Sequence, residues 1–254
     1  MERPVIDISS VSFSYNDTAV LDDISLTVHR HDFVGIIGPN GGGKTTLLKL
    51  LLGLLEPEKG SVRVLDNRPR DISMRLGYVP QNTDINQEFP VTVKEVALMG
   101  RLGAARRFLR YSRKDLEAVE RALQQVDMWE YRNVRIGDLS AGQRQRVFIA
   151  RALTSDPEIM FLDEPTASVD PAGQVKLFDI LKTLNKDLTI LFVSHGLNIL
   201  LDYVNKVACV NRQLVFHDAP HVTSEMLDKT FGFSIEQICP LEELPPAGER
   251  PAGH

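Results

Sequence analysis

Cysteine, net positive charge and long apolar segments are all scarce in this chain of 254 residues. Its two cysteines, Cys209 and Cys239, fit no metal-binding spacing, so we expect unbridged thiols in a reducing compartment. No apolar run approaches the roughly 18 residues that a membrane-spanning helix requires. A net charge of −5 provides no general field for nucleic acid, so we expect no nucleic-acid partner. The first residues, 1–4, contain no apolar signal segment, which favours a cytoplasmic chain.

A glycine-rich stretch, residues 38–46, matches the phosphate-binding pattern G-x-x-x-x-G-K-[ST]. The apolar run 33–37 before it predicts a buried strand, and the helix-forming residues 47–52 follow it. Free backbone N–H groups at a helix N-terminus attract a phosphate, so we expect a nucleotide here. Lys44 should reach the β- and γ-phosphates, and the Thr45 hydroxyl should ligate Mg²⁺. The expected phosphate-loop residues are Gly38, Pro39, Asn40, Gly41, Gly42, Gly43, Lys44, Thr45 and Thr46.

Alternating short β-rich runs and helical segments predict an α/β fold with a mixed sheet. The expected strands are residues 5–8, 11–15, 24–28, 33–37, 61–65, 76–79, 159–163, 188–193, 207–210 and 214–216. The first three predict a small antiparallel sheet with a turn at Asn16-Asp17. The near-continuous apolar runs 159–163 and 188–193 are typical of a parallel sheet covered on both faces.

Helical patterns dominate from Gln81 to about residue 157. Capping boxes are expected at Thr92 with Glu95 and at Ser112 with Asp115. The expected helices are residues 93–101, 116–126, 144–153 and, after an N-cap at Asp170 and a proline at 171, residues 171–184. Residues after 240 are rich in Pro, Gly and Glu, which favours a mobile tail.

Four further stretches carry candidate chemistry. Asp163 ends a buried strand and could hold Mg²⁺, and Glu164 follows it, where a carboxylate could deprotonate an attacking water. Ser140 is placed as a helix N-cap, and with Gly142 it could also form a second anion site. Gln81 could ligate Mg²⁺ and sense movement of the helical part. The fourth is His195, which follows a strand, where contact with a γ-phosphate is plausible.

Together these stretches resemble the ATP-binding subunits of ABC transporters over roughly residues 3–220. The matching motifs, in the family's order, are Tyr15 as the adenine-stacking aromatic, 38–46 as Walker A, Gln81 as the Q-loop, 139–143 as the signature, 159–164 as Walker B with the catalytic glutamate, and His195 as the switch histidine; 167–170 fits the D-loop. Two small departures are Ala141, where glycine is commonest, and Gly42, which replaces a common alanine. Gly42 should make the loop slightly more flexible.

The resemblance implies the ABC ATPase fold: a phosphate-loop NTPase core, an N-terminal antiparallel β subdomain and an inserted α-helical subdomain. The implied divisions are an ATPase domain at 1–222, with core segments 1–86 and 158–222 and a helical subdomain at about 87–157, and a C-terminal helix and flexible tail at 223–254.

It also implies a head-to-tail homodimer around two ATP molecules. Ser140, Gly142 and Gln143 of one copy would face the γ-phosphate held by Lys44 of the other. Mg²⁺ would be bound directly by Thr45 and Gln81, and by Asp163 through water. Glu164, His195 and Lys44 would be the catalytic residues.

Residues 87–93 and 96–101 resemble the branch that imports zinc, manganese or iron, and would form a groove for membrane permease subunits. These would work with a periplasmic or lipoprotein metal-binding protein, and the chain would lie on the cytoplasmic face of the membrane. Zinc is the first candidate. An importer of iron–siderophore or vitamin B12, or an ABC ATPase outside transport, are the alternatives.

Two sets of residues near these motifs stay open. The basic cluster consists of Arg101, Arg106, Arg107, Arg110, Arg113 and Lys114. It could be a solvated face or a docking surface for a partner or for lipid headgroups. His217 and His221 are expected to be ordinary surface histidines, since a metal site would need further ligands.

Overall fold

The computed structural model describes residues 3–81, 90–102, 111–194 and 202–218. Several residues discussed above lie outside this part of the chain: Phe89, Arg106, Arg107, Arg110, His195, His221, Cys239 and the tail. The strands are β1 Ile6–Tyr15, β2 Thr18–Val28, β3 Phe33–Ile37, β4 Lys59–Val64, β5 Leu76–Val79, β6 Ile159–Asp163, β7 Thr189–Val193, β8 Lys206–Asn211 and β9 Gln213–Asp218. The α-helices are α1 Lys44–Leu51, α2 Val93–Leu98, α3 Arg113–Gln125, α4 Ala141–Leu153 and α5 Pro171–Leu184. Short 3-10 helices are η1 Pro69–Arg75, η2 Met99–Arg101, η3 Trp129–Tyr131 and η4 Ile136–Asp138.

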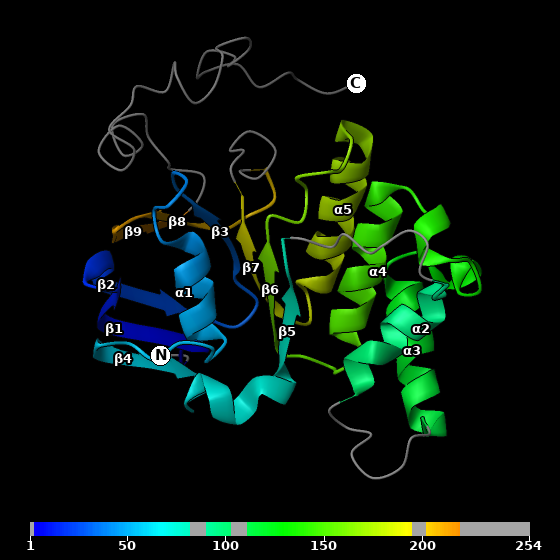
Figure 1. Ribbon diagram of the computed structural model, residues 1–254, viewed down its shortest axis with the longest axis horizontal. Helices are drawn as coiled ribbons and strands as arrows, with labels where there is room; N and C mark the ends of the chain where they lie inside the picture. The colour runs from blue at the N-terminus through cyan, green and yellow to red at the C-terminus, as the bar shows by residue number, and fades with distance from the viewer. Residues whose placement is uncertain (1–2, 82–89, 103–110, 195–201, 219–254) are drawn as a thin grey trace, which may run out of the picture.

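A six-stranded sheet in the order β5-β6-β7-β3-β8-β9 forms the centre of the molecule (Figure 1). Its strands pair in parallel except β9, which is antiparallel to β8. Alternate side chains of one strand enter two separate cores, as in β6, where Met160 and Leu162 pack towards the helices α4 and α5 while Ile159 and Phe161 pack towards α1. Burial on both faces explains the near-continuous apolar runs in the sequence. The combination of parallel and antiparallel strand pairs confirms the predicted mixed sheet.

An antiparallel sheet in the order β2-β1-β4 packs beside this sheet, with α1 between them (Figure 1). The turn at Asn16 and Asp17 is confirmed, since both residues have left-handed φ angles of 45° and 65°. The prediction of two separate strands at 5–8 and 11–15 is wrong. They form the single strand β1, whose register shifts between Ile8 and Val11 beside Ser10, a residue with φ of 48°. A bulge keeps one strand continuous where the side-chain alternation breaks.

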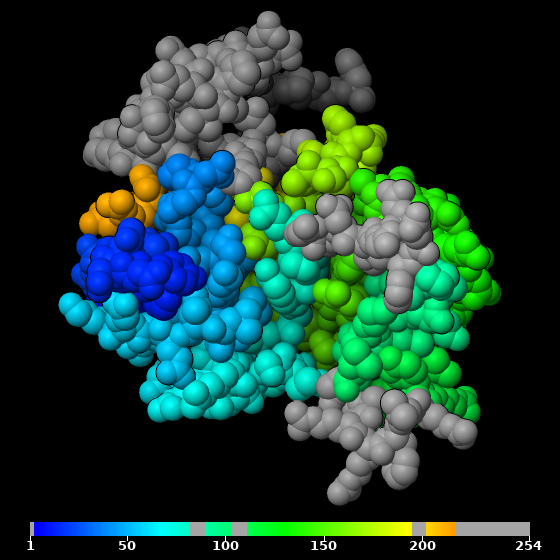
Figure 2. Space-filling model, viewed as in Figure 1, coloured from blue at the N-terminus to red at the C-terminus, as the bar shows by residue number. Residues whose placement is uncertain are grey.

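Helices α2, α3 and α4 lie together on the side of the molecule opposite the antiparallel sheet (Figure 1). The space-filling view shows the N-terminal strands and these helices at opposite ends of one face (Figure 2). Both predicted capping boxes are present, at Thr92 with Glu95 and at Ser112 with Asp115. The expected helix 93–101 ends sooner, because α2 tightens into the 3-10 helix η2 at Met99. Within the described residues, no helix is long and apolar enough to cross a membrane.

Candidate functional site

The phosphate loop, Gln81 and the end of β6 surround one cavity of about 570 Å³. The cavity is lined by Tyr15, Val20, Asn40, Gly41, Gly43, Lys44, Thr45, Thr46, Gln81 and Glu164. All of these except Val20 are residues that the sequence predicts as site residues. Small-molecule sites commonly measure about 300–1,000 Å³, so the cavity has the volume for a nucleotide.

Lys44 is the first residue of α1 and is buried beneath the loop. Its Nζ donates hydrogen bonds to the carbonyl oxygens of Gly38 and Pro39, both at 2.9 Å. Burial lowers the pKa of Lys44, and the negative charges of Glu164 and Asp163 oppose this shift. A buried ammonium is costly unless it is paired, so this position favours an anion such as a phosphate.

The β8–β9 hairpin supports the phosphate loop from outside the cavity. The Arg212 backbone N–H donates to the Gly42 carbonyl oxygen at 3.0 Å. A Cβ on Gly42 would lie 2.8 Å from the Val210 carbonyl oxygen, and one on Gly38 would overlap the same oxygen. Close approach of the hairpin therefore explains the glycine at 42 better than the added flexibility that the sequence suggested.

Gly43 caps the N-terminus of α1 with a left-handed φ of 105°. A Cβ at this position would also lie 2.7 Å from Cδ2 of Leu21. The left-handed φ favours glycine, because other residues rarely adopt this conformation, and a Cβ would also force the Leu21 side chain to move. The first residues of α1, Lys44, Thr45 and Thr46, line the cavity, and the unpaired N–H groups at a helix start favour an anion.

Asp163 ends β6 and is 2% exposed. Burial and then the charge of Glu164 raise the pKa of Asp163, while Lys44 and a hydrogen bond from the Thr45 side chain oppose the shift. Among the described residues, the Asp163 Oδ1 atom has no hydrogen-bond partner. A buried carboxylate oxygen of this kind beside the Thr45 hydroxyl, with the Gln81 amide in the cavity that Thr45 also lines, is an oxygen donor set of the type that Mg²⁺ prefers. The residues present therefore fit the ion.

Glu164 stands one residue beyond β6 with a left-handed φ of 48°. Its backbone N–H donates to the Val193 carbonyl oxygen at 3.1 Å, which holds the residue at the carboxyl edge of the sheet. A glutamate in this conformation costs about 1–2 kcal/mol, and such strain is typical of functional sites. Gln81 Nε2 donates to Glu164 Oε2 at 2.7 Å, so the Gln81 amide oxygen is left as the candidate Mg²⁺ ligand.

Tyr15 lies at the rim of the cavity, 42% exposed, and makes an edge-on contact with Phe13 at 4.9 Å between ring centroids. This contact orients the ring that the sequence assigns to adenine stacking. His195 lies outside the described residues. The preceding residue, Ser194, donates its backbone N–H to the Ile36 carbonyl oxygen at 3.0 Å, at the end of β3 that leads to the phosphate loop.

The signature residues lie elsewhere and line no part of this cavity. Ser140 caps α4, where its hydroxyl accepts from Gln143 N at 3.2 Å and its N–H donates to Gln143 Oε1 at 2.9 Å. Ser140 is exposed. Ala141 is the first residue of α4 and is absent from the positive-φ residues, so alanine needs no left-handed backbone there. Gly142 faces Val169 of the expected D-loop, whose Cγ1 would lie 3.3 Å from an added Cβ.

Sequence reasoning missed two residues of the site, Val20 and Tyr78. Val20 lines the cavity from β2. Tyr78 belongs to β5; burial, together with the charge and a hydrogen bond of Asp163, raises its pKa. Both positions depend on strand pairing that brings distant segments together, so no local pattern could have identified them.

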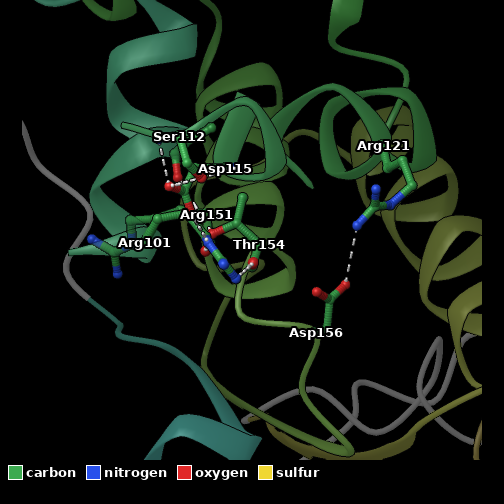
Figure 3. Close-up of polar contacts among 8 residues, drawn as sticks. Arg101, Ser112, Asp115, Arg121, Arg151, Thr154 and Asp156 are labelled. Carbon is green, nitrogen blue, oxygen red and sulfur yellow. Dashed lines mark hydrogen bonds and ion pairs between the residues drawn. The ribbon is translucent and has the colours of Figure 1, made fainter. Parts of the chain in front are cut away.

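The segment expected to form a partner groove is largely buried. Val93, Val96, Ala97 and Leu98 pack in the core, and among the described residues of this segment Met99 is an exposed large apolar side chain, at 41%. Assigning Arg101 to a solvated face or a docking surface is wrong: its side chain is 18% exposed and pairs with Asp115 (Figure 3). Gly100 lies so close to α4 that a Cβ would overlap the Arg151 carbonyl oxygen and the Thr154 hydroxyl. The segment Met99-Gly100-Arg101 therefore packs against α4 and, through Arg101, pairs with Asp115 of α3.

Comparison with known proteins identifies the family of the chain. The family model described as "ABC transporter" matches residues 21–167. The chain is 39% identical to the zinc uptake system ATP-binding protein ZurA of Listeria innocua, covering 85% of this chain and 86% of that protein. It is 38% identical to the manganese transport system ATP-binding protein MntB of Halalkalibacterium halodurans, covering 95% of this chain and 98% of that protein.

Among solved structures, the fold matches an inward-facing conformation of a candidate metal-chelate type ABC transporter. The TM-score is 0.82 at 28% sequence identity, covering 91% of this chain and 90% of that one. Fold and cavity together define a phosphate-loop ATPase. The chain belongs to the ABC transporter family, as an ATP-binding and ATP-hydrolysing subunit.

Proposed function

We propose that this chain powers a metal importer as one of two identical subunits that close around two ATP molecules. One observation carries the proposal: the cavity gathers the phosphate loop, Gln81 and Glu164, whereas Ser140 stands exposed at the start of α4 and lines none of it. A helix N-terminus suits a phosphate, and the Ser140 hydroxyl, whose oxygen caps Gln143 N, could still donate its proton to one. A second copy would therefore supply Ser140, Gly142 and Gln143 to the open side of this cavity.

Within one site, Lys44 and the loop N–H groups hold the β- and γ-phosphates, and Tyr15 stacks on adenine. Thr45 and Gln81 would bind Mg²⁺ directly, and Asp163 through water; the ion would neutralise phosphate charge. Glu164 orients a water and takes its proton as the oxygen attacks the γ-phosphorus and the bond to ADP breaks. A positioned base of this kind contributes roughly 10²–10⁴-fold. His195 contacts the γ-phosphate.

Gln81 connects the proposed Mg²⁺ site to the base Glu164. Its amide donates to Glu164 at 2.7 Å, so a nucleotide that draws Gln81 towards the ion also changes the surroundings of the base. ATP drives closure only to the extent that it binds the closed dimer better than the open one. Hydrolysis removes that difference and reopens the dimer.

Permease subunits would receive this motion at the helical side of the molecule, where Met99 and Leu102 are exposed at 41% and 61%. The chain would then lie on the cytoplasmic face of the membrane, and a separate periplasmic or lipoprotein metal-binding protein would deliver the cargo. Zinc is the first candidate, and manganese or iron come next. The zinc relative is 39% identical and the manganese relative 38%, so the similarity supports metal import without separating the two metals.

Metal uptake by cells tests the proposal. Cells that lack this chain should take up less radioactive zinc, and the wild-type chain should restore uptake while Glu164→Gln should not. Loss of manganese or iron uptake instead would change the cargo only. Unchanged uptake of all three metals, with loss of siderophore-bound iron or vitamin B12 uptake, would refute metal import.

A further inference from the structure

Two segments far apart in the sequence are hydrogen-bonded side by side within the helical part. One, residues 91–94, leads into α2, and the other, residues 132–136, leads towards the signature. The hydrogen bonds run from Val93 N to Val134 O at 3.0 Å, from Lys94 N to Arg132 O at 2.9 Å and from Ile136 N to Val91 O at 2.9 Å, and Thr92 and Arg135 form an antiparallel bridge. We call this pairing the signature ladder.

Both sides of the signature ladder are anchored. Thr92 caps α2 in a capping box, where Glu95 Oε2 accepts from Thr92 N at 2.8 Å. Val93 and Ile136 are fully buried in the same core. Because each side is fixed by packing and by caps, the ladder cannot slide without breaking hydrogen bonds and burial together.

The ladder ends three residues before the signature turn. Ile136 is the first residue of η4, and its carbonyl oxygen accepts a hydrogen bond from Leu139 N at 3.4 Å. The Arg144 guanidinium in turn donates to the Leu139 carbonyl oxygen at 2.5 Å. Ser140 follows at once as the cap of α4. The position of the exposed Ser140 is therefore set by a short, continuous chain of backbone hydrogen bonds that begins at residue 91.

The 3-10 helix η2, which follows α2 directly, is tied to the C-terminal end of α4. Arg101 Nη1 donates to the Thr154 carbonyl oxygen at 2.8 Å. Helix α2 is thus joined near both ends to the segment that contains the signature helix. These contacts hold α2 in a fixed place relative to the segment that leads to Ser140.

We propose that the signature ladder is a positioning element that preorganises Ser140 for the nucleotide held by a second copy. This rests on the ATP-held dimer of the proposed function. A loop that is already ordered loses less conformational entropy on association, so its ladder raises dimer affinity without touching ATP. Residues 91–94 also follow the Q-loop glutamine in sequence by about ten positions.

Proline substitution removes ladder hydrogen bonds selectively. Val93 is the first residue of α2, where proline is well tolerated, and Thr92 before it has φ −86° and ψ 160°, which suits a pre-proline residue. Val93→Pro deletes the N–H that reaches Val134, whereas the matched control Val93→Ala keeps that N–H and removes the side chain. Ile136→Pro and its control Ile136→Ala form a second pair. Proline fits there because Arg135, the residue before it, has φ −67° and ψ 140°, which suit a pre-proline residue.

The experiment uses full-length chains that carry Glu164→Gln. With MgATP, each proline variant should dimerise roughly two- to tenfold more weakly than its alanine control, while monomer affinity for ATP stays unchanged. Hydrogen exchange should become faster at the Gln143 amide, which Ser140 caps, and stay unchanged at Thr45 and Thr46. A merely structural defect would move both regions.

Equal dimerisation and equal Gln143 exchange in both proline–alanine pairs would overturn the proposal. The second pair keeps the test decisive if one variant fails to fold, as judged by circular dichroism. A parent Glu164→Gln chain that stays monomeric in MgATP would instead refute the dimer of the proposed function, and the ladder proposal with it.

Discussion

Replacing Arg101 with methionine should destabilise the joint between α2, α3 and α4. Arg101 Nε donates to Asp115 Oδ1 at 2.8 Å and its Nη1 donates to the Thr154 carbonyl oxygen at 2.8 Å (Figure 3). The two side chains of the ion pair are 18% and 8% exposed. Methionine preserves the length of the stem but removes every donor, so Asp115 loses its cation while it stays buried.

The magnitude follows from these contacts. A hydrogen bond to an ionised group contributes about 1.5–3 kcal/mol and one to a backbone carbonyl about 1 kcal/mol. Asp115 keeps its hydrogen bonds from Ser112, at 2.7 Å and 2.8 Å, so the cost should lie near the lower end of that sum. We expect a loss of roughly 3 kcal/mol in unfolding free energy, or about 6–12 °C in melting temperature. Urea denaturation followed by circular dichroism measures it.

The effect should depend on pH. Hydrogen bonds from the Ser112 side chain and then from Arg101 lower the pKa of Asp115 from 3.8 to about 2. Stabilisation by the ionised carboxylate is therefore complete above pH 3.8 and disappears as the pH falls through about 2. The difference between Arg101→Met and wild type should accordingly shrink over that interval.

An exposed ion pair provides the matched control. Arg113 pairs with Glu117 at 2.9 Å, with side chains 92% and 48% exposed, so Arg113→Met should change the unfolding free energy by less than about 0.5 kcal/mol. Equal, small losses in Arg101→Met and Arg113→Met would refute the role of the buried joint.

Three other variants test the site. Glu164→Gln should bind ATP with wild-type affinity but lower kcat about 10²–10⁴-fold; wild-type turnover would refute its role as base. Gly43→Ala, with φ of 105° and Leu21 2.7 Å from the added Cβ, should weaken ATP binding roughly tenfold in calorimetry, and unchanged affinity would contradict the loop geometry. Met99→Glu should reduce recovery of the chain with membranes that contain the permease, while its ATP affinity stays unchanged. The control Val175→Glu, at a site 46% exposed on α5, should leave both recovery and ATP affinity unchanged. Equal recovery of the two variants would remove Met99 from the docking surface.

Local signals in the sequence predicted much of this molecule. The strand at 33–37, the helix at 171–184 and the capping boxes at Thr92 and Ser112 appear where the residues place them. Each depends on neighbours within a few positions, such as a hydroxyl that caps an amide three residues later. The cavity residues were also predictable, because the motifs of the phosphate loop and of Walker B specify backbone positions at the same edge of a parallel sheet.

Features that depend on contacts between distant parts of the chain could not be predicted from local sequence patterns. Arg101 belongs to a basic run in the sequence, yet its partners lie 14 and 53 residues away. Gly42 looks like a flexible substitute until the Val210 carbonyl oxygen is placed beside it. The separation of β1 into two strands failed because a bulge at Ser10 interrupts the alternation without ending the strand.

The central claim is that a complete ATP site needs two copies of this chain. Light scattering on the Glu164→Gln chain with MgATP measures it, because one chain has a mass of 28.4 kDa. We predict twice that mass with MgATP and a return to the monomer mass when Ser140→Arg is added, with monomer affinity for ATP unchanged. A chain that stays monomeric in MgATP, or dimerises equally with arginine at 140, would contradict the claim.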